Sequence, residues 1–104
     1  MSGMSSRERN TLAPIYLLSN GSATGPGYEW PGGIGVFLAE FTGGTVSLEM
    51  NGPNPASDTW IAVGTDTTLS ASGGAVFNLP AKAVIRAAVA GGATAVYATV
   101  KQLD

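Results

Sequence analysis

The fold is decided by residues 34–50, which have the sequence IGVFLAEFTGGTVSLEM. Residues 34–42 form the longest apolar run of the chain, and such a run predicts a strand that is buried on both faces. Residues 45–50 alternate between apolar and polar side chains, which predicts a half-exposed strand. Gly43-Gly44 lies between them and is a two-residue hairpin signal. This stretch therefore predicts two strands joined by a tight hairpin.

The same pattern of short strands and turns continues on both sides of this segment. Further strands are expected at residues 14–19, 59–63, 68–70, 75–79 and 94–102. Glycine, proline and asparagine cluster between these strands, because turns need the backbone angles that these residues supply. Ser72-Gly73-Gly74 is one such predicted turn.

Residues 81–90, AKAVIRAAVA, are ambiguous. Their alanine content, the preceding Pro80 and the following Gly91-Gly92 favour a helix. Three β-branched residues and the strand character of the neighbouring segments favour a strand. We predict a strand, with Gly91-Gly92 as a hairpin turn into the last strand.

Seven or eight short strands at spacings of about 8–12 residues are typical of an all-β, antiparallel β-sandwich of the jelly-roll type. We expect one such domain at residues 13–104. Residues 1–12, MSGMSSRERNTL, contain few apolar side chains and predict an extended N-terminal arm. We expect this arm to contact a neighbouring subunit.

The composition of the 104-residue chain excludes several classes of function. Only 12% of the residues are charged, the net charge is -2, and there is no histidine or cysteine. Disulfides, thiolate chemistry and histidine-based catalysis are therefore excluded, and there is no basic excess for binding nucleic acid. The apolar runs are far shorter than the ~20 residues that span a bilayer. Alanine occurs 15 times, so the core is small and favours assembly with other chains.

No motif in the chain predicts an enzyme or a cofactor site. The carboxylates are dispersed, whereas acid–base catalysis needs a pair in one pocket. Glu40 falls in the most apolar strand, where we expect it to pair with Arg86 or Lys101. Asp66 lies in a turn, but a single carboxylate does not specify a calcium site. We expect no catalytic residue, cofactor or metal.

The aromatic residues are the better candidates for binding. Tyr28 and Trp30 flank a Pro-Gly loop, where an exposed pair could stack on a sugar, a base or a partner side chain. The alternative is that Trp30 covers one open end of the sandwich. Trp60 lies in the middle of a predicted strand, and we expect it in the core.

Several stretches of the chain carry a resemblance to a known group of proteins. They are residues 41–48 (FTGGTVSL), 51–54 (NGPN), 59–64 (TWIAVG), 77–81 (FNLPA) and 85–89 (IRAAV). These stretches resemble small β-rich virion proteins of tailed bacteriophages, and the resemblance covers roughly residues 28–104. The resemblance implies a non-enzymatic capsid decoration (cement) protein, made in the host cytoplasm and located on the capsid surface of the virion. It also implies a homotrimer whose partner is the major capsid protein.

Two other functions remain open at this point. One is a different virion component, such as a head fibre or a tail or fibre protein. The other is a carbohydrate-binding β-sandwich module that uses Tyr28 and Trp30. The candidate interface residues are Arg7, Arg9, Tyr28, Trp30 and Arg86.

Overall fold

The computed structural model describes residues 14–54, 56 and 58–103, and the regular structure within them is all β. The strands are β1 (Ile15–Gly21), β2 (Tyr28–Glu29), β3 (Gly33–Thr42), β4 (Thr45–Asn51), β5 (Trp60–Ala62), β6 (Thr68–Leu69), β7 (Gly73–Leu79), β8 (Val84–Ala90) and β9 (Thr94–Gln102). The all-β prediction is confirmed, and so is a strand within residues 81–90, although it begins only at Val84. No helix that could cross a membrane occurs among the described residues.

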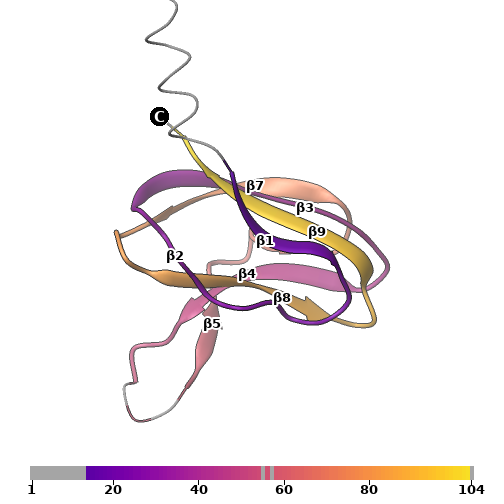
Figure 1. Cartoon of the computed structure of the whole chain (residues 1–104), viewed down its shortest axis with the longest axis horizontal. Helices are drawn as coiled ribbons and strands as arrows, with labels where there is room; N and C mark the ends of the chain where they lie inside the picture. The colour runs from indigo at the N-terminus through magenta and orange to yellow at the C-terminus, as the bar shows by residue number, and fades with distance from the viewer. Residues whose placement is uncertain (1–13, 55, 57, 104) are drawn as a thin grey trace, which may run out of the picture.

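The strands form two antiparallel sheets packed face to face (Figure 1). Sheet A has the order β1-β9-β3-β7, and sheet B has the order β2-β8-β4-β5, with the short β6 also paired to β4. The pairs β1–β9, β2–β8, β3–β7 and β4–β5 are nested, as in one long hairpin that has rolled up into two layers. This nesting is the jelly-roll topology, and the predicted fold is therefore confirmed.

The core lies between the two sheets. It is built from alternate residues of the strands, because successive side chains of a strand point to opposite faces. On β9, for example, Val96, Ala98 and Val100 are buried, whereas Tyr97 is exposed. Alanine recurs among the buried side chains, which alternate with large ones such as Trp30, Phe37 and Leu48.

The two predicted Gly-Gly hairpins are wrong, because each link carries the chain from one sheet to the other. Gly43-Gly44 connects β3 in sheet A to β4 in sheet B, and Gly91-Gly92 connects β8 in sheet B to β9 in sheet A. All four glycines have a positive φ, so the predicted tight turns do form. The links pack against each other, since a Cβ atom on Gly44 would lie 2.5 Å from the backbone nitrogen of Ala93.

The prediction that β3 is buried on both faces is also wrong. Its inner residues Gly35, Phe37 and Ala39 are buried, but Ile34 and Leu38 on the outer face remain 48% and 49% exposed. The physical reason is the number of layers: sheet B covers one face of sheet A, and no described segment covers the other.

Two local features differ from the sequence-based expectation. β2 was not expected, and it forms because Tyr28 and Glu29 pair with Ile85 and Val84 of β8. Gly73-Gly74, expected in a turn, begins strand β7. The N-terminal arm, including Arg7 and Arg9, lies outside the described residues.

Candidate interaction surface

The structure does not bring the sequence-predicted interface residues together. Tyr28 is 36% exposed on β2 and pairs with the core residue Ile85. Cross-strand partners point to the same face of a sheet, so Tyr28 lies on the opposite face from Arg86, the next residue of β8. Trp30 is fully buried. The prediction of an exposed Tyr28–Trp30 pair is therefore wrong.

Trp30 is buried because it sits where the chain crosses from β2 to β3. Its backbone N–H donates to the Ala83 carbonyl, and its own carbonyl accepts from the Lys82 N–H, both at 2.7 Å. Its indole packs on Phe77 with ring centroids 4.9 Å apart. The indole N–H donates to the Gly33 carbonyl at 3.3 Å. Trp30 therefore closes one end of the sandwich, as the alternative interpretation predicted.

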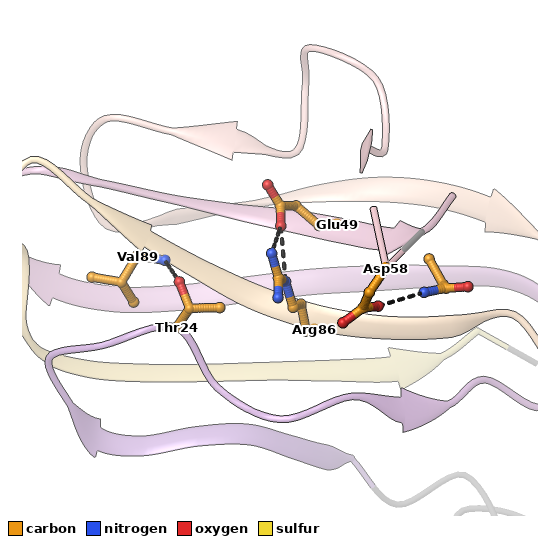
Figure 2. Close-up of polar contacts among 6 residues, drawn as sticks. Thr24, Glu49, Asp58, Arg86 and Val89 are labelled. Carbon is orange, nitrogen blue, oxygen red and sulfur yellow. Dashed lines mark hydrogen bonds and ion pairs between the residues drawn. The ribbon is translucent and has the colours of Figure 1, made fainter. Parts of the chain in front are cut away.

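Arg86 forms an ion pair on the outer face of sheet B. It lies directly opposite Glu49 across the β8–β4 pair. Both Nε and Nη2 of Arg86 contact Oε1 of Glu49, at 2.9 and 2.8 Å (Figure 2). The guanidinium also lies 4.3 Å from the centre of the Trp60 ring, a cation–π distance. The expected partner, Glu40, is instead exposed on sheet A.

The position of Trp60 is a further correction. It was expected in the core, but it pairs with Asn51 at the end of the short strand β5 and is only partly buried. Because the outer-face residue Arg86 covers its ring, Trp60 belongs to the outer face of sheet B.

Other polar groups of this sheet are also paired within the chain: Asn51 donates to Asp58, and the Val89 N–H donates to the Thr24 hydroxyl (Figure 2).

The outer face of sheet A has the opposite character, because it exposes apolar side chains. Its large exposed apolar residues come from all four strands: Tyr16 of β1, Tyr97 of β9, Ile34 and Leu38 of β3, and Val76 of β7. They are 45–62% exposed. The partly buried Val36 lies between Ile34 and Leu38 on the same face and pairs with Val76. We call this set of residues the apolar face.

A shallow hollow of about 400 Å³ lies on the apolar face. Its lining includes Leu38, Tyr97 and the two glycines at the start of β7. Gly74 lies directly opposite Leu38 on this face and adds no side chain there. Glu40 and Lys101 lie on the same face, across from Tyr97 and Val36 respectively.

Contiguous exposed apolar surface on a folded protein usually marks a site of interaction with another molecule. The apolar face is therefore the strongest candidate site in the described part of the chain. Sequence reasoning missed it, although the signal was present. In residues 34–39 both alternating sets of side chains lack charge, and a strand of that kind has either two covered faces or one face available to a partner.

The described residues contain no group of three or more His, Cys, Asp or Glu side chains that could hold a metal ion. Comparison with known proteins found no matching family model, no similar curated protein and no similar solved structure. The arrangement of side chains is therefore the basis for inferring the function.

Proposed function

We propose that this chain is a structural protein of a tailed-bacteriophage particle, and that it acts as a capsid decoration (cement) protein. The apolar face of sheet A is the observation that carries the proposal. It is an apolar surface on a rigid sheet, which suits contact with another protein rather than with a small molecule. The resemblance of residues 28–104 to small virion proteins supplies the class of partner, the major capsid protein.

The proposed mechanism is physical and needs no chemical step. A protein that binds the assembled shell and not its separated subunits stabilises the shell by mass action. Completely burying a leucine-sized side chain contributes about 1.5–3 kcal/mol, and Leu38 is still 49% exposed. Each such contact is therefore modest. Many copies around a shell, and a trimeric arrangement of the chain, would make the modest contacts add up.

The carbohydrate-binding alternative has lost its basis, because it required Trp30 to be exposed. The second candidate function is another virion component, either a head fibre or a tail protein. Cryo-microscopy of the particle separates these locations directly, because a decoration protein covers the shell in many copies.

The test uses the phage whose genome encodes the chain. We expect particles that lack the protein to lose their DNA at a lower temperature than complete particles. Added wild-type protein should restore heat resistance, and Leu38→Glu should not. The matched control is Ile61→Glu, because Ile61 is also about half exposed, at 52%, but lies on β5 of the other sheet. Equal heat resistance with and without the protein would contradict the proposal.

A further inference from the structure

Strand β7 has an open edge. It stands at the end of sheet A, and β3 is the strand that it pairs with. The backbone hydrogen bonds found outside the sheets do not involve residues 73–79 of the described chain. In a strand with one neighbour, every second residue points its N–H and C=O groups away from the sheet. β7 therefore offers a row of backbone donors and acceptors to an additional strand.

The other edge strands are protected against such pairing, and β7 is not. β1 has two register shifts against β9, whereas β2 and β5 are only two and three residues long. Short strands, bulges, charges and prolines are the usual means of blocking a sheet edge. β7 has seven residues, GGAVFNL, without charge or proline, and its register with β3 is unbroken. It is the most open edge of the described structure.

The sequence of β7 is complementary to itself when two copies run antiparallel. Pairing that overlaps all seven residues is centred on Val76, so that Val76 faces Val76 of the second copy. Each small residue in the first half of the strand then faces a larger residue in the second half. The pairs are Gly73 with Leu79, Gly74 with Asn78, and Ala75 with Phe77. The absence of charge means that no repulsion opposes this pairing.

We infer that a second copy of this chain binds along β7, so that two copies of sheet A form one continuous sheet about a twofold axis at Val76. Val76 is 62% exposed and would be partly covered by its counterpart. The apolar faces of the two copies would then adjoin. One strand from each copy contributes less than the about 1,200–2,000 Å² of a stable interface, so the pairing is weak and depends on concentration. This inference does not rest on the proposed function.

The first test is site-specific cross-linking. The chain has no cysteine, so Val76→Cys introduces a single thiol. Directly opposed side chains in antiparallel strands have Cβ atoms about 4.5–5.5 Å apart. A short bis-maleimide should therefore join two Val76→Cys chains efficiently. Ile61→Cys, at an exposed position on β5, is the matched control and should cross-link only at the background rate of random collision.

The second test is a charge exchange at the same position. Val76→Lys and Val76→Glu should each abolish the concentration-dependent dimer in sedimentation, because like charges face each other at the twofold axis. An equimolar mixture of the two variants should restore it. Circular dichroism spectra and melting temperatures close to those of the wild type would show that both variants fold.

Three outcomes would overturn the inference: a wild-type chain that stays monomeric at its highest soluble concentration, an oligomer whose size Val76→Lys does not reduce, or a mixture of the two variants that fails to recover the wild-type size. A trimer unaffected by Val76→Lys would exclude β7 pairing and leave the proposed function standing. If a trimer forms through another surface and β7 pairing also occurs, sedimentation should show species larger than the trimer, and Val76→Lys should reduce them to the trimer. If Val76→Lys instead reduces binding to phage shells and the chain does not self-associate, the edge is occupied by the capsid protein and the inference fails.

Discussion

The indole of Trp30 occupies the space that a side chain on Gly35 would need. A Cβ atom on Gly35 would lie 2.5 Å from Cη2 of Trp30 and 2.9 Å from Cζ of Phe77. Trp30 comes from the crossing between the sheets, and Gly35 lies on the inner face of β3. The absence of a side chain at Gly35 therefore allows the largest side chain of the core to close the end of the sandwich.

Gly35→Ala should consequently destabilise the fold. Inserting a methyl group into a packed core typically costs about 1–3 kcal/mol, and both neighbouring groups here are rigid rings. Urea denaturation should show a lower midpoint with an unchanged slope. Gly73→Ala is the control, because its Cβ would approach other atoms no closer than 3.8 Å. An equal loss of stability in both variants would show that Trp30 does not press on Gly35.

The two glycines between β3 and β4 should respond differently to the same substitution. Both have a positive φ, 69° at Gly43 and 63° at Gly44, so alanine at either position costs about 1–2 kcal/mol of backbone strain. A Cβ atom on Gly43 meets nothing within 4 Å, whereas one on Gly44 would collide with the Ala90 carbonyl and the Ala93 N–H. Gly44→Ala should therefore be clearly more destabilising than Gly43→Ala in thermal unfolding. Equal effects would mean that the two links between the sheets are not in close contact.

The Glu49–Arg86 pair should show a measurable but small coupling energy. The side chains are 21% and 27% exposed, and cross-strand ion pairs of this kind contribute about 0.2–1 kcal/mol. A double-mutant cycle with Glu49→Gln and Arg86→Met should give a coupling in this range, and 1 M salt should reduce it. Glu40→Gln combined with Arg86→Met should give no coupling, because Glu40 lies on the other sheet. A coupling with Glu40 as large as that with Glu49 would contradict the observed pairing.

The hydroxyl group of Thr67 should contribute to the free energy of unfolding. Thr67 is 1% exposed, and its Oγ1 donates a hydrogen bond to the Val63 carbonyl within the turn between β5 and β6. Thr67→Val keeps the shape of the side chain but leaves that carbonyl without this donor, which should cost about 1–2 kcal/mol. Thr65→Val, at an exposed position in the same turn, should be nearly neutral in urea denaturation. A neutral Thr67→Val would show that water replaces the hydroxyl.

The sequence predicted local structure better than it predicted contacts. The alternation in residues 45–50 located β4, and the β-branched residues of 81–90 correctly outweighed the helix signals there. Gly73-Gly74 shows where local reasoning fails. Glycine is typical of turns, but here it lies in a strand that pairs with β3, and a Cβ on Gly74 would lie 2.5 Å from Cδ2 of Leu38 on β3. That neighbour is distant in sequence, and no local pattern reveals it.

The candidate site could be predicted only in part for the same reason. Glu40 was predicted to pair with Arg86 or Lys101, but Arg86 pairs with Glu49 instead. The choice depends on which strands are neighbours: β8 lies beside β4, and β3 belongs to the other sheet. The apolar face depends on which side chains of β3 the second sheet covers. Sheet B covers the inner side chains, and no described segment covers the outer ones.

By itself, the sequence determined the all-β class, the positions of most strands and the tight glycine turns, because alternation and turn chemistry act between residues close together in the chain. The tertiary structure alone decided which sheet each strand joins, that Trp30 is buried, and that sheet A keeps an exposed apolar face and an open edge at β7. These features depend on pairing between strands far apart in the sequence, and the packing of the whole chain selects that pairing.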